Sequence, residues 1–163
     1  MKIILSIMIL LFISGCTMKY QEPTDIEYST LSVPNKIFKR GFNFTLSSHF
    51  VSSLNTNNCV EKWKEVEKKN SDFEVIKIPA NKEFAIYYQY FTKYGIYKVF
   101  GAFKPKENKH YVVSSKCRVH KCYIYVHTYN NNGEKIFVKV KKGVDNLKTN
   151  HVCFPIFDEK GQN

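Results

Sequence analysis

Short segments in which apolar and polar residues alternate recur along most of this chain, and turn residues separate them. Residues 73–78 alternate and end at Pro79, and residues 84–91 are rich in aromatic and β-branched side chains. A two-residue period of this kind is typical of half-buried β-strands. Asn132-Gly133, which precedes a segment at residues 136–140, indicates a hairpin because both residues accept positive φ angles.

This series of about seven to nine strands predicts a mainly all-β chain that folds as an antiparallel β-sandwich. One short helix is expected near residues 58–69, because Val60, Trp63 and Val66 recur at helical spacing after the N-cap candidates Asn57 and Asn58. Trp63 would anchor that helix in the core.

The composition fits one folded domain. The chain has 163 residues, of which 44% are hydrophobic and 15% aromatic. These fractions argue against a disordered chain, and the length argues against a multidomain enzyme while allowing one domain or two very small ones.

The first residues have the pattern of a secretory signal peptide. Lys2 precedes an apolar run over residues 3–13, which is shorter than the ~20 residues that a membrane-spanning helix needs. The run ends in Ile13-Ser14-Gly15-Cys16, which resembles the lipobox of bacterial lipoproteins. The resemblance implies that residues 1–15 are removed and that Cys16 carries fatty acyl chains such as palmitate. Several acyl chains give stable membrane anchoring.

The lipoprotein resemblance also predicts a location. Thr17 stands where enteric-type lipoproteins of the inner membrane carry Asp. We therefore expect a lipid anchor in the outer membrane of a Gram-negative host, with the protein facing the periplasm. Residues 16–34 contain two prolines and no sustained periodicity, which predicts a flexible tether before a β-sandwich domain at residues 35–163.

Four cysteines remain after Cys16, an even number in an oxidising compartment. Three disulfide connectivities are possible. We favour Cys117–Cys122, because a four-residue turn can close this bridge, together with Cys59–Cys153, which would join the two ends of the domain.

The alternative for these cysteines is a zinc site, because Cys117, His120, Cys122, His151 and Cys153 are all of zinc-ligating type. Their spacing matches no standard zinc pattern, and exported thiols tend to oxidise. We expect no metal and no cofactor.

A second resemblance covers residues 73–140. Pro79-Ala80-Asn81-Lys82, Phe103-Lys104-Pro105, Tyr111-Val112-Val113 and Cys122 follow a loose pattern that resembles small β-sandwich domains of envelope lipoproteins. The resemblance implies a fold and no activity.

The sequence offers no catalytic motif. It lacks Gly-x-Ser-x-Gly and His-Glu-x-x-His, and its five histidines and fourteen acidic residues are scattered. We therefore expect a protein that is not an enzyme, although a hydrolase would remain possible if a histidine and a carboxylate met in a pocket of the fold.

The formal net charge is +11, and the basic residues are mostly lysine. Lysine clusters occur at Lys62, Lys64, Lys68 and Lys69; at Lys104, Lys106 and Lys109; at Lys116, Arg118 and Lys121; and at Lys139, Lys141 and Lys142. In the envelope such charge favours an anionic lipid or glycan surface or an acidic protein, and the compartment argues against nucleic acid.

Tyrosines are concentrated in one segment and form the candidate interface: Tyr87, Tyr88, Tyr90, Tyr94 and Tyr97. Exposed tyrosine is enriched at protein interfaces, and the alternative is sheet packing. The sequence thus predicts a non-catalytic binding or accessory module for an envelope protein complex. The alternative is an immunity or inhibitor lipoprotein that neutralises an envelope-directed toxin or hydrolase.

Overall fold

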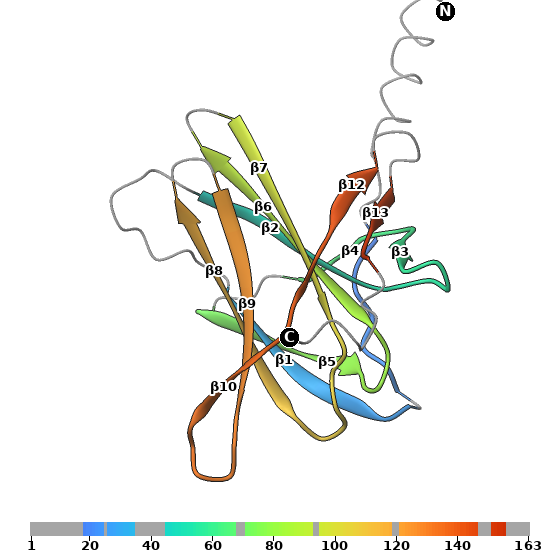
Figure 1. Ribbon diagram of the computed structural model, residues 1–163, viewed down its shortest axis with the longest axis vertical. Helices are drawn as coiled ribbons and strands as arrows, with labels where there is room; N and C mark the ends of the chain where they lie inside the picture. The colour runs from blue at the N-terminus through green and yellow to red at the C-terminus, as the bar shows by residue number, and fades with distance from the viewer. Residues whose placement is uncertain are drawn as a thin grey trace, which may run out of the picture.

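A computed structural model gives the fold of the chain (Figure 1). The structure describes residues 18–24, 26–34, 45–67, 71–92, 95–118, 121–146 and 151–155. The predicted signal peptide, Cys16, Tyr94 and His120 lie outside these ranges. Among the described residues no helix is long and apolar enough to cross a membrane.

The described chain is mainly β-strand, as predicted. The strands are β1 (Tyr28–Pro34), β2 (Thr45–Ser53), β3 (Cys59–Val60), β4 (Lys64–Glu65), β5 (Phe73–Pro79), β6 (Phe84–Thr92), β7 (Gly95–Phe103), β8 (His110–Arg118), β9 (Lys121–Tyr129), β10 (Lys135–Val138), β11 (Lys141–Lys142), β12 (Val144–Asn146) and β13 (His151–Cys153). They form two five-stranded sheets and one three-stranded sheet.

The first sheet has the strand order β10-β9-β8-β1-β5. All of its pairs are antiparallel except β1–β8, which is parallel. Leu31 and Val33 of β1 and Ile78 of β5 are completely buried, whereas Val75 and Lys77 of β5 are exposed. This alternation sends one set of side chains into the core and the other outward.

The second sheet has the strand order β11-β7-β6-β2-β4, and its pairs are antiparallel. Phe84, Ile86, Tyr88 and Tyr90 of β6 lie on one face, as their spacing predicts. They share a single hydrophobic core with the inward side chains of the first sheet. Fully burying a side chain of this size contributes about 1.5–3 kcal/mol.

The third sheet, β12-β13-β3, covers part of the opposite face of the second sheet. A second core forms there from Val60, Val152 and Phe154 of the small sheet and its flanks and from Ala85 and Ala102 of β6 and β7. The second sheet is therefore packed on both of its faces.

The predicted helix near residues 58–69 is absent: β3 and β4 occupy this segment of the described chain. Asn58 adopts a left-handed φ of 56°, and the Asn55 side-chain oxygen accepts hydrogen bonds from the backbone of Asn57 and Cys59. Both features form a tight turn, and Cys59 then pairs with β13. Val60 is nevertheless buried. The spacing of the apolar residues therefore indicated burial, although the segment does not form a helix.

The predicted flexible tether is also wrong for much of residues 16–34. Residues 28–34 form β1, which pairs with both β5 and β8 inside the first sheet. The preceding residues are fixed as well: Glu65 donates its backbone N–H to the Met18 carbonyl at 2.8 Å, and the Tyr20 hydroxyl donates to the Lys77 carbonyl at 2.8 Å. The folded unit therefore includes residue 18 and begins well before residue 35.

Candidate functional site

The tyrosines predicted to form an interface are core residues. Tyr88 and Tyr90 are completely buried between the two large sheets. Tyr87 is buried on the other face of β6, where its ring lies 5.3 Å from that of Trp63. Tyr97 is half-buried against the main core. The predicted interface is thus contradicted at Tyr87, Tyr88 and Tyr90, which are buried, whereas Tyr97 of β7 keeps partial exposure.

The predicted disulfide between Cys59 and Cys153 is confirmed, with a Cα–Cα distance of 4.0 Å. The two residues lie directly opposite each other on β3 and β13. Cys122 is also disulfide-bonded, and the β8–β9 register places Cys117 opposite it, which is the backbone arrangement that the predicted second bridge requires. A cysteine in a disulfide supplies no thiolate, so the zinc alternative loses Cys122 and Cys153 as ligands. No group of three possible metal ligands occurs within the described ranges.

A pocket of about 580 Å³ lies between the β7–β8 loop and the β9–β10 hairpin. Tyr111, Ile136 and Val138 give it an apolar floor. The other lining residues are polar or basic: Lys104, Lys106, Lys109, Thr128, Tyr129, Asn130, Asn131 and Asn132. The walls therefore combine three ammonium groups with amide, hydroxyl and aromatic groups.

Hydrogen bonds fix the loop that carries the three lysines. The backbone N–H of Lys106 donates to the Tyr111 hydroxyl at 2.8 Å, and the Ser29 hydroxyl donates to the Lys106 carbonyl. Asn81 donates its backbone N–H to the Pro105 carbonyl at 2.8 Å, and Thr30 donates its own to the Lys109 carbonyl at 3.0 Å. The loop backbone is thus held on β1, β8 and the β5–β6 turn.

The opposite wall is the predicted Asn-Gly hairpin, which is confirmed as the β9–β10 connection. The Asn130 side-chain oxygen accepts hydrogen bonds from the backbone of Asn132 and Glu134, and Gly133 adopts a φ of 77°. These features fix the backbone that carries Asn131 and Asn132 at the rim of the pocket.

The charged side chains that line the pocket are all basic. Its lining, which consists entirely of described residues, contains no carboxylate and no imidazole. General acid–base catalysis normally uses such groups, whereas three lysines in one pocket provide a strongly positive potential. Sequence analysis identified the lysine cluster but gave no sign that the hairpin would lie beside it.

A row of aromatic rings runs along the outward face of β9 and β10. Neighbouring ring centroids are 6.5 Å apart between Tyr123 and Tyr125, 6.5 Å between Tyr125 and Phe137, 6.1 Å between Phe137 and His127, and 5.5 Å between His127 and Tyr129. We call these five residues the aromatic row. Tyr129, at the end of β9, also lines the basic pocket, whose other strand residues lie on the inward side of the sheet.

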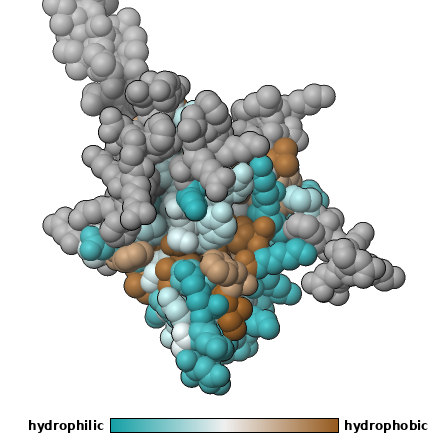
Figure 2. Space-filling view, turned by 60° about the vertical axis from the view of Figure 1, so that its left-hand side comes forward, coloured by the Kyte–Doolittle hydropathy of each residue, from teal (hydrophilic) through white to brown (hydrophobic). Residues whose placement is uncertain are grey.

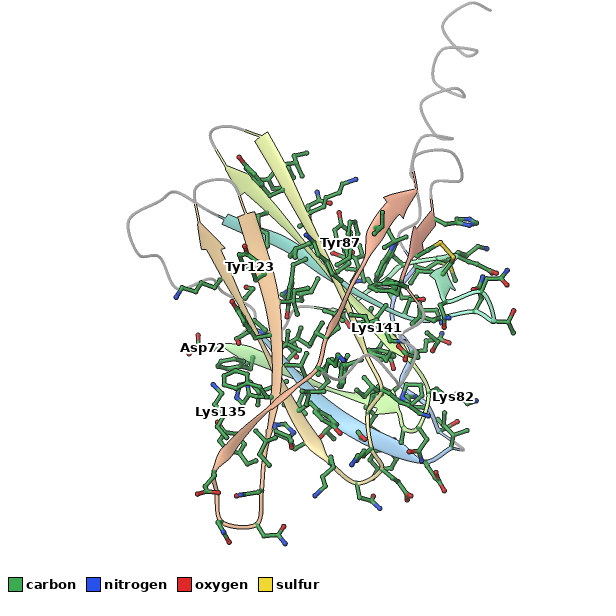
Figure 3. The ribbon with its side chains drawn as sticks, viewed as in Figure 1. Asp72, Lys82, Tyr87, Tyr123, Lys135 and Lys141 are labelled. Atoms are coloured by element: carbon green, nitrogen blue, oxygen red, sulfur yellow. A yellow bond between two sulfur atoms is a disulfide. The ribbon has the colours of Figure 1, made fainter. Side chains whose placement is uncertain are left out.

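The row follows from strand alternation, because Val126 and Ile124 of β9 face the core and their neighbours face outward. Figure 3 shows Tyr123 beside β9 and Lys135 beside β10. The alternation of Tyr123, Tyr125 and Tyr129 is visible in the sequence, whereas the predicted interface lay at Tyr87, Tyr88, Tyr90, Tyr94 and Tyr97.

His127 is the one imidazole of the aromatic row, and its pKa is shifted. Its burial lowers its pKa from the usual value of 6.5, and the charges of Lys135 and His110 lower the pKa further. His110 itself is held by the hydroxyls of Thr30 and Ser32, at 2.8 and 3.2 Å from its two ring nitrogens.

This shift in pKa predicts that acid destabilises the protein through His127. The unfolded chain binds the proton more tightly than the folded one, so the stabilisation is present above a pH of about 6.5 and is lost as the pH falls through the folded-state pKa. We expect the urea midpoint to fall between about pH 7 and pH 5, and His127→Gln to reduce that fall. An identical fall in the variant would assign the acid sensitivity to other groups.

Comparison of the chain with protein-family models, with curated proteins and with solved structures finds no match. The function is therefore inferred from the chain's own residues.

Proposed function

We propose that this protein is a lipoprotein of the Gram-negative outer membrane, anchored through Cys16 and facing the periplasm. Its β-sandwich domain would be a non-catalytic binding module for an acidic surface of an envelope protein. The observation that carries the proposal is the pocket lined by Lys104, Lys106 and Lys109 and by no acidic residue.

The fixed backbone of this pocket supports specific binding. Hydrogen bonds hold the lysine-bearing loop, so less ordering of the main chain is required when a partner docks. Complementary charge accelerates association and selects acidic partners. The apolar floor would exclude water from the centre of the contact.

The proposed anchor would hold the domain close to the bilayer. Met18 is hydrogen-bonded to Glu65 of β4, and only Thr17 separates it from Cys16. Two residues span at most about 7 Å. The β4 side of the molecule would therefore lie near the membrane surface, and partners would reach the protein from its other sides.

Replacement of the anchoring cysteine tests the location. We expect Cys16→Ser to abolish incorporation of a radiolabelled fatty acid and to prevent recovery of the mature chain with outer-membrane fractions. The physical reason is the loss of the acyl chains that provide membrane affinity. Fatty-acid labelling that persists in the variant would contradict anchoring at Cys16.

Charge removal in the pocket tests the binding role. We expect the triple variant Lys104→Gln, Lys106→Gln, Lys109→Gln to reduce capture of a cross-linked envelope partner by roughly tenfold or more, because complementary charge contacts are lost. The association rate of the wild-type protein should also fall steeply with salt. Capture efficiency and salt dependence are the two measurements.

The matched control is Lys82→Gln, Lys98→Gln, Lys142→Gln, which removes the same charge from exposed positions outside this pocket. Equal losses of capture in both triple variants would mean that binding depends on the net charge of the protein and not on the pocket.

The identity of the captured partner decides between the two functions. If the partner is a toxin or hydrolase whose activity the protein suppresses, the protein is an inhibitor. If the partner belongs to a structural assembly, the protein is an accessory component.

A further inference from the structure

The outer face of the first sheet differs from both faces of the second sheet. The main core covers one face of the second sheet and the third sheet covers part of the other, whereas the outward side chains of β10, β9, β8, β1 and β5 include many that are exposed and apolar. Phe137 is 63% exposed, and Tyr125 is 39% exposed. Figure 2, which brings the left-hand side of Figure 1 forward, shows apolar patches interleaved with polar ones on the described surface.

Among the described side chains of these five strands, the charged ones on this face are basic. The five strands contain a single acidic residue, Glu74, and its side chain is buried on the core side. The Lys135 ammonium lies 5.2 Å from the centroid of the Phe137 ring, and the Lys77 ammonium lies 4.8 Å from that of Tyr28. Lys116 adds a third exposed cation on β8.

We propose that this face binds a linear glycan that bears carboxylate groups, with the aromatic row as its platform. The C–H faces of sugar rings would pack on the aromatic faces, whose π-electrons carry partial negative charge. The tyrosine hydroxyls would exchange hydrogen bonds with sugar hydroxyls, and Lys135 and Lys116 would pair with the carboxylates. Peptidoglycan, whose carboxylates lie mainly on the peptides attached to its sugar chain, is the carboxylate-bearing glycan of the compartment that the proposed function assigns.

The geometry of the row favours an extended polymer. Tyr123 and Tyr129 are six positions apart on one strand, which corresponds to about 20 Å. The four ring-to-ring steps lie between 5.5 and 6.5 Å and pass from β9 to Phe137 of β10 and back to β9. An extended sugar chain could therefore contact the exposed members Tyr123, Tyr125, Phe137 and Tyr129, whereas His127 is buried and packs against Phe137 and Tyr129.

The position of this face relative to the proposed anchor argues against the lipid bilayer as its ligand. Met18, the described residue closest in sequence to Cys16, is bound to β4, at the edge of the second sheet. Figure 1 shows β4 and β10 on opposite sides of the molecule. The aromatic row also lies along strands instead of at a protruding loop, where apolar side chains could enter a membrane.

Co-sedimentation with an insoluble glycan tests the proposal. The full chain, purified in mild detergent, would be mixed at low salt with peptidoglycan sacculi. The comparison probes are chitin, an uncharged glycan, together with vesicles of anionic phospholipid and soluble polyglutamate as a competitor. We expect the protein to bind sacculi more strongly than chitin or vesicles. Binding to sacculi should weaken as the salt concentration rises, and polyglutamate should compete with it only in part.

The double variant Tyr125→Ala, Phe137→Ala should weaken binding to sacculi roughly tenfold or more, because two stacking contacts are removed. The matched control, Ile96→Ala, Val144→Ala, truncates two apolar side chains of similar exposure that lie outside the first sheet and should bind like the wild type. Thermal unfolding of both double variants checks that the fold is retained.

Four results would overturn the proposal: no sedimentation with sacculi, equal binding by the Tyr125/Phe137 variant, equal binding to chitin, or stronger binding to the vesicles. None of these bears on capture of a protein partner through the lysine pocket, which the Lys104/Lys106/Lys109 variant tests separately.

Discussion

Loss of the Cys59–Cys153 disulfide is expected to lower the free energy of unfolding by about 4–5 kcal/mol. The bridge joins residues 94 positions apart, so it closes a loop that contains most of the folded unit. In the chain-entropy model a loop of this length strongly restricts the unfolded ensemble, and that restriction stabilises the folded state. The bridge also fixes β3 to β13, the strands that carry Val60 and Val152 into the second core.

The double variant Cys59→Ser, Cys153→Ser measures this contribution without leaving a free thiol. Its urea unfolding curve would be compared with that of the wild type under non-reducing conditions. Trp63, the single tryptophan, contacts Tyr87 and Phe100, so its fluorescence reports the loss of the surrounding packing. A change in stability of less than about 1 kcal/mol would show that the unfolded chain is already compact enough to make the bridge redundant.

Strand positions were predictable because their signals are local. Residues 84–91 alternate with a two-residue period, and they form β6 with Phe84, Ile86, Tyr88 and Tyr90 on one face. The β9–β10 hairpin was predictable because Gly133 supplies the positive φ that its turn requires. Each of these features depends on residues close together in the sequence.

The errors arose where distant residues decide the outcome. Val60, Trp63 and Val66 are spaced as in a helix, but the partner of Cys59 is Cys153, and pairing with β13 holds this segment extended. Residues 28–34 resembled a tether because their two partners, β5 and β8, come much later in the chain. Local propensity is a weak guide when tertiary contacts compete with it.

The location of the candidate sites depended on the same long-range information. Alternation predicts which side chains share a face of a strand, and it says nothing about which faces another layer covers. Other layers cover Tyr87, Tyr88 and Tyr90 on the two faces of β6, whereas the outward tyrosines of β9 remain exposed. The lysine pocket likewise requires the β7–β8 loop to lie beside the β9–β10 hairpin.

Tyr88→Ala is expected to lower the free energy of unfolding by about 3–5 kcal/mol, the usual cost of truncating a fully buried aromatic side chain. The Tyr88 ring is completely buried in the main core, in edge contact with His49 at 5.7 Å. Its removal leaves a cavity between the two large sheets. Chemical denaturation of the purified variant measures the loss.

Tyr88→Phe is the matched control, because it retains the ring and removes only the hydroxyl. That hydroxyl is buried and has no hydrogen-bond partner among the described residues, and burial raises the pKa of Tyr88 well above 10, so the group stays neutral. Removing an unsatisfied hydroxyl is expected to be neutral or stabilising by about 1 kcal/mol. A strong loss in Tyr88→Phe would reveal a partner for the hydroxyl.

Tyr125→Ala is the corresponding substitution of a tyrosine on the outer face of the first sheet, and its effects are to be compared with those of Tyr88→Ala. Its side chain is partly exposed, so the change in stability should stay within about 0.5–1 kcal/mol. Tyr88→Ala should thus reduce stability, and Tyr125→Ala should reduce glycan binding with the fold intact. If Tyr88→Ala instead left the free energy of unfolding unchanged and weakened glycan binding, β6 would have to be accessible to the ligand. The originally predicted interface at the tyrosines of β6 would then be supported.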